Sequence, residues 1–156
     1  MITQPHDSPP AAPAGADAAV ASAFAAALDR GDLAAAARML APDCECRDGG
    51  LLARGDAAVI AIYRAAASWS ERGFDDVRQA SEVESAAAGR ARVAVTTMLM
   101  RMPGRWHRLR HARELAIGAD GRITGIVHVC DPAAASAFRA FVQVCGVPPP
   151  PPGLGV

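Results

Sequence analysis

A chain of 156 residues, 51% of them hydrophobic, is long enough for one domain with a substantial core and too apolar to stay disordered. Its 16 basic and 16 acidic side chains give a formal charge of zero, unlike the basic excess typical of nucleic-acid-binding proteins. The composition therefore predicts a single folded domain that does not bind nucleic acid.

Both ends of the chain differ in composition from the middle. Residues 1–15 and 147–156 are rich in proline and have no hydrophobic periodicity, so we expect extended or disordered tails around a domain over residues 16–146. The N-terminus shows no secretory pattern, and the alanine-rich stretch 16–28 is shorter than the ~20 residues that cross a bilayer. We expect a cytoplasmic protein that does not enter membranes. Its four scattered cysteines favour free thiols over a disulfide framework.

The first half of the domain has helical spacing of its apolar residues. Asp17 and Asp56 are suited to cap helices, and Pro42 stops a helix that would otherwise continue. The pattern predicts helices over residues 17–28, 33–40 and 56–68, with a short strand over 44–47.

From residue 74 onward the pattern changes to strands. Pro103-Gly104 and Asp120-Gly121 are turn sequences between alternating segments. Helices followed by a run of antiparallel strands predict an α+β fold with the helices on one face of a curved sheet. The predicted strands are 75–83, 90–102, 105–117 and 122–130, followed by a closing helix over 133–145.

The hairpin over residues 105–130 carries three of the four histidines. Side chains alternate across a strand with a period of two, so each strand presents one set of residues to each face. One face is apolar near the second turn and polar farther along, which is typical of a sheet that lines a pocket. This face carries His107, Leu109, His111, Arg113, Leu115 and Ile117, with Ile126, His128 and Cys130 from the second strand.

The order of elements, with LDRGDLAAAARMLAPDCECRD early and ELAIGADGRITGIVHVCDP late, resembles the nuclear transport factor 2-like superfamily over about residues 17–132. This superfamily includes ketosteroid isomerases, SnoaL-like polyketide cyclases and limonene epoxide hydrolase. The resemblance implies a cone-shaped fold, in which a strongly bent antiparallel sheet wraps around the N-terminal helices and leaves a deep apolar pocket. It also implies chemistry that needs neither a metal nor a cofactor.

Set against a ketosteroid isomerase, Asp48 takes the place of the catalytic carboxylate, and Tyr63 that of a pocket tyrosine. The two oxyanion donors of that enzyme are replaced by Phe24 and Arg113, so steroid isomerisation by its mechanism is not expected. The residues that this resemblance places on the pocket wall are Phe24, Tyr63, Thr96, Met98, Met100, Ile126 and Cys130.

Asp48, His111, Arg113 and His128 are the candidate catalytic residues. A carboxylate partly buried in an apolar pocket becomes a stronger base, although Asp48 is equally suited to cap the turn that begins at Gly49. Arg113 is suited to hold a substrate oxygen, or alternatively to form a buried pair with Asp48. The histidines lie on adjacent strands and could relay protons, or be polar core residues bonded to the backbone.

Two further features concern partners. Cysteines and histidines together also allow a zinc site, but the Cys44-x-Cys46 spacing is shorter than structural zinc sites use, and packing cysteines are the better interpretation. Trp106, Arg108 and Arg110 lie on the opposite, convex face of the hairpin. They suit the core and rim of a homodimer interface, or alternatively a solvated charged strand.

The sequence thus predicts a cofactor-independent SnoaL-like enzyme, of an isomerase, cyclase or epoxide hydrolase type. Its acid–base chemistry would be cyclisation, isomerisation, dehydration or epoxide opening of a small apolar, polyketide- or terpene-like molecule. The alternatives are a module of the same fold that binds a small molecule without turnover, and a module that only dimerises. A purely apolar pocket would favour the former alternative, and a pocket filled by side chains the latter.

Overall fold

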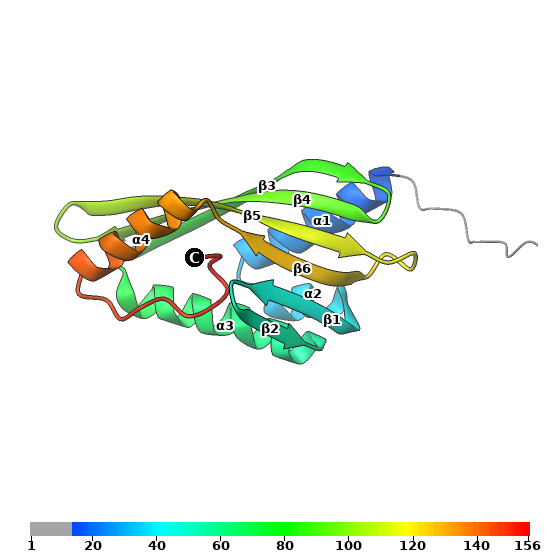
Figure 1. Cartoon of the computed structure of the whole chain (residues 1–156), viewed down its shortest axis with the longest axis horizontal. Helices are drawn as coiled ribbons and strands as arrows, with labels where there is room; N and C mark the ends of the chain where they lie inside the picture. Colours follow the sequence, from blue (N-terminus) through cyan, green and yellow to red (C-terminus); the bar gives the residue numbers. More distant parts are fainter. Residues whose placement is uncertain (1–13) are drawn as a thin grey trace, which may run out of the picture.

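The computed structural model describes residues 14–156 (Figure 1). The predicted N-terminal tail, residues 1–15, lies outside the described residues except for its last two, which begin the first helix. The described elements are α1 (Ala14–Asp29), α2 (Leu33–Arg38), β1 (Leu40–Asp48), β2 (Leu51–Arg54), α3 (Asp56–Gly73), β3 (Asp76–Ala87), β4 (Arg90–Arg101), β5 (Arg105–Ile117), β6 (Ile123–Val129) and α4 (Pro132–Val144).

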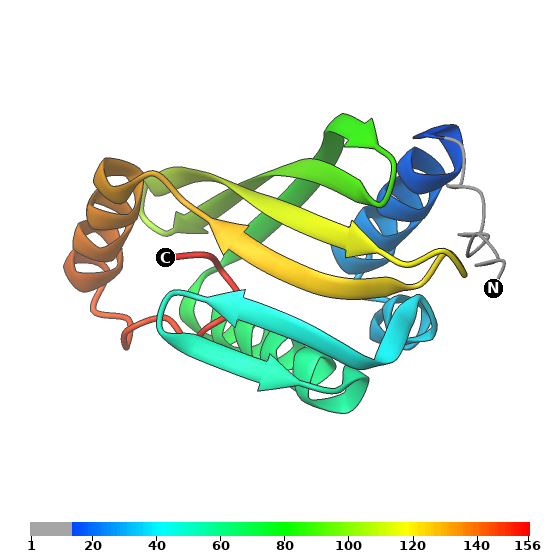
Figure 2. The same ribbon diagram turned by 45° about the vertical axis from the view of Figure 1, so that its right-hand side comes forward.

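The six strands form one bent, unclosed sheet in the order β2-β1-β6-β5-β4-β3. Neighbouring strands are antiparallel except β1 and β6, which run parallel. Helix α1 packs on β3 and β4, α3 packs on β1, and α4 packs against β5 at the far end of the sheet (Figure 2). The predicted α+β fold with a bent sheet around N-terminal helices is confirmed, with one parallel pair in the otherwise antiparallel sheet.

Local sequence signals explain where most elements begin. The Asp32 side chain accepts a hydrogen bond from the Ala35 N–H at 2.9 Å, and Asp131 caps α4 in the same way with Pro132 in its first turn. Helix α2 ends four residues before Pro42, which lies within β1. Strand β2 was not predicted, because its half-exposed residues have no apolar alternation to mark it.

The interior has two clusters of buried side chains. The first lies between the helices and the middle of the sheet and includes Phe24, Val59 and Ile126. The second lies near α4 and includes Trp69 and Phe138. All four cysteines are free thiols. Burial raises the pKa of Cys44 to about 11 and that of Cys46 to about 12, so both are protonated packing residues.

The register of β4 against β5 corrects one prediction. Arg101 pairs with Arg105 across a three-residue loop, which pairs Val95 with His111 and Val93 with Arg113. Paired residues of antiparallel strands point to the same face, so the odd-numbered residues of this part of β4 line the interior. The prediction that Thr96, Met98 and Met100 face the pocket is therefore wrong. The observed pairing of β4 with β5 differs by one residue from the expected pairing, which places all three residues on the convex face.

The C-terminal segment, residues 145–156, has no helix or strand, yet it packs on the domain. It runs from the end of α4 back toward the centre of the molecule and is drawn in red in Figures 1 and 2. Val147 and Leu154 are buried, and the Trp69 indole Nε1–H donates to the Pro148 carbonyl oxygen at 2.9 Å. The predicted tail over residues 147–156 has no helix or strand, but it is part of the folded domain, which corrects the expectation of an extended or disordered tail.

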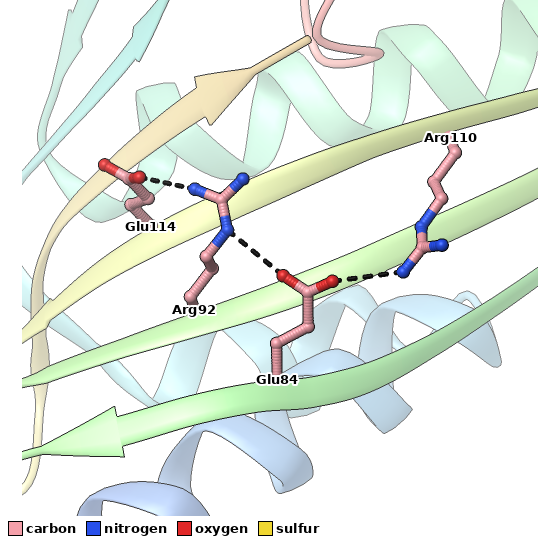
Figure 3. Close-up of polar contacts among 4 residues, drawn as sticks. All are labelled: Glu84, Arg92, Arg110 and Glu114. Atoms are coloured by element: carbon pink, nitrogen blue, oxygen red, sulfur yellow. Dashed lines mark hydrogen bonds and ion pairs between the residues drawn. The ribbon is translucent and has the colours of Figure 1, made fainter. Parts of the chain in front are cut away.

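Charged side chains cover part of the convex face (Figure 3). Glu84 accepts hydrogen bonds from Arg92 and Arg110, each at 3.1 Å, and Arg92 also reaches Glu114 at 2.6 Å. Trp106 is 61% exposed on the same face, where it pairs with Met100. Within residues 14–156, no helix combines the length and the apolar composition needed to span a lipid bilayer.

Candidate functional site

A cavity of about 470 Å³ lies between α3, the turn after α1 and strands β3 and β4. Its polar wall groups include Gln79, Thr97 and Arg113 from the sheet and Tyr63 from α3. Gly153 and Leu154 of the C-terminal segment form another part of the wall. Sites for small molecules commonly have volumes of roughly 300–1,000 Å³, so this cavity has room for such a ligand.

Arg113 is the charged group of this wall that is most deeply buried, with only 3% of its surface exposed. Its Nε and Nη1 atoms have no hydrogen-bond partner among the described residues. The guanidinium carbon lies 5.2 Å from the centre of the Tyr63 ring, which gives the charge partial compensation by a cation–π contact. The described residues contain no ion pair between Arg113 and Asp48, so the alternative of a buried pair is not what the structure shows. Arg113 has donors to offer to a ligand oxygen.

Tyr63, His128 and Asp48 form a chain that leads away from the cavity. The Tyr63 hydroxyl lies 3.0 Å from His128 Nε2, and His128 Nδ1 lies 3.9 Å from Asp48 Oδ2. Burial, reinforced by the charge of Arg113, lowers the pKa of His128 well below its usual value, so the imidazole is neutral at pH 7. Burial raises the pKa of Tyr63, so the phenol is protonated. The roles in the 3.0 Å contact depend on the tautomer of the imidazole: with its proton on Nδ1, His128 accepts the Tyr63 hydrogen at Nε2.

His111 stacks on His128 with ring centres 5.9 Å apart and an angle of 13° between the rings. It is buried, and neither of its ring nitrogens has a hydrogen-bond partner among the described residues. Burial, followed by the charge of Arg113, lowers the pKa of His111 to about 3. The expected pairing of the two histidines across the strands is therefore a contact between neutral rings.

Asp48 lies at the end of β1 and is 8% exposed. Its Oδ2 atom accepts hydrogen bonds from the backbone N–H groups of Gly153, at 2.5 Å, and Gly155, at 3.3 Å. Asp48 is thus covered by the C-terminal segment and does not line the cavity. The sequence predicted a buried Asp48 but could not indicate that the C-terminal segment lies over it.

The structure brings the four predicted catalytic residues into one buried group, of which Arg113 lines the cavity. The predicted lining residues divide into several classes. Tyr63 lines the cavity, while Phe24 and Ile126 are part of the first core cluster. Cys130 is half-buried beside the second cluster, with its thiol 3.9 Å from the Arg110 carbonyl oxygen.

Sequence reasoning missed Thr97, Gln79 and the two wall residues of the C-terminal segment. Thr97 pairs with Leu109, because the loop between β4 and β5 has three residues. A prediction that assumed a loop of this length would have placed Thr97 inside. Nothing local marks Gln79, which is held at the cavity wall by a 2.8 Å hydrogen bond to Asp29. Within residues 14–156 no three His, Cys, Asp or Glu side chains gather closely enough to hold a metal ion.

Comparison with known proteins shows the family and the fold of this chain. A family model described as "SnoaL-like domain" matches residues 21–126, which is more than half of the chain. No curated protein matches the chain in sequence.

Several solved structures are similar in fold. An LEH-like epoxide hydrolase from M. tuberculosis has a TM-score of 0.61 and 18% identity, over 87% of this chain and 98% of the other. A candidate polyketide cyclase from Xanthomonas campestris pv. campestris has a TM-score of 0.60 and 20% identity, over 83% and 98% of the two chains. TerC, co-crystallised with polyporic acid, has a TM-score of 0.61 and 18% identity, over 82% and 98%.

Proposed function

Because the chain belongs to the family of SnoaL-like domains, we propose that it is an enzyme that performs acid–base chemistry on a small, largely apolar molecule in the cavity. Cyclisation, isomerisation, dehydration and epoxide opening all move a proton while charge develops on an oxygen. Each therefore needs a proton-transferring group and a donor for that oxygen, side by side in a site of low polarity. Tyr63 and Arg113 supply these two groups at the cavity wall.

The observation that carries this proposal is the burial of Arg113, two of whose guanidinium nitrogens have no hydrogen-bond partner among the described residues. A buried charge without a hydrogen-bond partner is costly, and it is found where a ligand completes its bonding. In a medium of low dielectric constant, a substrate oxygen that gains negative charge interacts strongly with Arg113. We therefore assign Arg113 to the oxygen that becomes an enolate, alkoxide or phenolate.

Tyr63 is the group proposed to exchange a proton with the substrate. As Tyr63 takes a proton from the substrate, its own proton passes to His128 Nε2, across the 3.0 Å contact. Asp48, 3.9 Å from the other ring nitrogen, would offset part of the burial and of the Arg113 charge that oppose the imidazolium. Asp48 therefore positions the proton, and Tyr63 is the residue that touches the substrate.

The same geometry favours a ligand that carries an acidic or carbonyl oxygen on an apolar frame. Arg113 would bind this oxygen, and the apolar part of the wall, which includes Leu28 and Leu154, would hold the frame. TerC, one of the structures of similar fold, was co-crystallised with polyporic acid. Its ligand is an acid, which is the class that the unpaired donors of Arg113 favour in this chain.

A binding module without turnover is the second candidate, since Arg113 would hold an anion equally well if no proton moved. Deuterium exchange separates the two functions. The wild-type protein should accelerate incorporation of deuterium from D₂O into the acidic CH₂ of 2-tetralone, followed by ¹H NMR. Tyr63→Phe should lower this acceleration by ~100-fold or more, since general acid–base contributions run to ~10²–10⁴.

Binding is measured separately by titration with the fluorescent anion 2-naphthoate. Arg113→Met should weaken binding about tenfold or more, because a hydrogen bond to a charged group contributes ~1.5–3 kcal/mol. Arg122→Met, at an exposed arginine in the turn between β5 and β6, is the control and should bind as the wild type does. Naphthoate binding without any accelerated exchange, over a panel of ketones, would favour the binding module. Equal affinity of the wild type and Arg113→Met would refute the assignment of Arg113.

A further inference from the structure

We propose that the space now filled by residues 153–155 is a second ligand subsite, and that the C-terminal segment is its intramolecular occupant. The subsite would take an apolar group that carries an N–H or O–H donor. Its place in the reaction depends on the proposed function, but its existence rests on the contacts of the segment alone.

The strongest contact is made by Asp48. Its Oδ2 atom accepts from two backbone N–H groups of the segment, Gly153 at 2.5 Å and Gly155 at 3.3 Å. These bonds join residues more than 100 positions apart, so they form only when the segment is docked. Asp48 is an acceptor-only group, so whatever replaces the segment must also bring a donor to it.

The two glycines fit the site because they have no side chains. A Cβ atom at Gly153 would lie 2.8 Å from the Ile62 side chain, and one at Gly155 would lie 3.1 Å from the His111 ring. Both residues also have positive φ angles, 108° and 76°, which glycine adopts most readily. The backbone therefore lies against the site as closely as a flat ligand would.

Leu154 supplies the apolar part of the contact. It is buried in the second core cluster, and together with Gly153 it forms the boundary between the cavity and the region around Asp48. If Leu154 and its neighbours left, the wall between Asp48 and the cavity would be removed. The cavity beside Tyr63 and Arg113 would then extend to Asp48 and His111.

The segment is an incomplete occupant of this space. It satisfies Asp48, but it leaves both ring nitrogens of His111 and Nδ1 of His128 buried without a hydrogen-bond partner among the described residues. Buried polar groups of native proteins are nearly always paired, so three unpaired nitrogens at one place point to another ligand. A hydroxyl group is both donor and acceptor, and could therefore pair with Asp48 and His111 together.

The chain between the two ends of the segment allows such an exchange. Residues 148–152 are all proline and have no N–H groups with which to bond the domain. The base is held at Val147 and by the Trp69–Pro148 hydrogen bond, and the tip by Leu154 and the bonds to Asp48. The tip can therefore leave while the base stays in place.

Amide hydrogen exchange on the wild-type full chain tests whether the tip opens. We expect the Gly153 and Gly155 amides to exchange at least 100-fold faster than the Val95 and Leu109 amides of the core, with rates that do not change in low urea. Such exchange reports local opening. Exchange as slow as in the core, and equally dependent on urea, would show that the segment leaves only on global unfolding and would overturn the proposal.

Titration with 2-naphthol, a neutral apolar donor, tests the subsite itself. Leu154→Asp should release the tip and raise affinity for 2-naphthol at least tenfold. Gly155→Val, whose side chain would meet His111, should do the same and serves if Leu154→Asp fails to fold. Pro149→Ala, at an exposed position of the segment, is the control and should match the wild type.

The anion 2-naphthoate distinguishes this proposal from the proposed function. Its affinity should change less than threefold in Gly155→Val, because Arg113 already faces the cavity when the segment is docked and Gly155 is not part of the cavity wall. Folded variants that bind 2-naphthol no better than the wild type would overturn the second subsite, whatever 2-naphthoate does. Loss of 2-naphthoate binding in Arg113→Met alone would leave the outcome for the segment unaffected.

Discussion

Replacing Arg113 with methionine should make the protein more stable while it weakens ligand binding. Arg113 is 3% exposed, and two of its guanidinium nitrogens have no hydrogen-bond partner among the described residues. Each unsatisfied buried donor costs about 1–3 kcal/mol. The cation–π contact with Tyr63, at 5.2 Å, returns about 2 kcal/mol. Methionine removes both effects and has nearly the length needed to fill the space.

The balance is a gain of about 2 kcal/mol in the free energy of unfolding, within the range of about 1–4 kcal/mol seen when buried charges are replaced by apolar residues. For a domain of this size, this corresponds to a rise in Tm of about 4–8 °C. In urea, the midpoint should rise with an unchanged slope.

The assay is urea and thermal unfolding of the wild type, Arg113→Met and the exposed control Arg122→Met, followed by circular dichroism. The control should lie within about 0.5 kcal/mol of the wild type. A loss of more than 1 kcal/mol in Arg113→Met would refute the reasoning, because it would show that Arg113 is satisfied within the protein and supports the fold. A gain in stability without weaker 2-naphthoate binding would separate the two roles and refute the assignment to the ligand.

Two other predictions follow from the histidines and the convex face. Burial lowers the pKa of His111 to about 3 and lowers that of His128 in the same direction. As the pH falls below about 6.5, these two histidines therefore bind protons in the unfolded chain before they do so in the folded chain. The free energy of unfolding should then decrease by about 1.4 kcal/mol per pH unit for each histidine. His111→Leu should reduce this slope between pH 5 and 6.5 in urea titrations, and an unchanged slope would contradict the neutral buried ring. We also propose a homodimer through the convex face, including Trp106, Arg108 and Arg110. Trp106→Asp should then yield monomers in light scattering, because a charge would be desolvated at the interface. The control Leu51→Asp, on the exposed strand β2, should leave the dimer intact. A monomeric wild type would exclude this interface.

At the candidate site, the sequence predicted which residues of one strand share a face, but it did not predict how neighbouring strands pair. The period of two correctly placed His111, Arg113 and His128 inside, because the direction of a side chain follows from its own strand. The faces of β4 depend on how many residues the connecting loop holds, and the three-residue loop reversed the expected set.

Sequence alone determined the order of the helices and of every strand except β2, the start of α2 after Asp32, and the polar inner face of the hairpin. These follow from local physics: capping and the periodicity of apolar residues. Only the tertiary structure decided the parallel pairing of β1 with β6, the contact of Tyr63 with His128, and the docking of the C-terminal segment on Asp48. Each of these joins residues far apart in the chain, where no local pattern exists, because the contact is fixed by how the whole sheet bends and what its interior leaves unfilled.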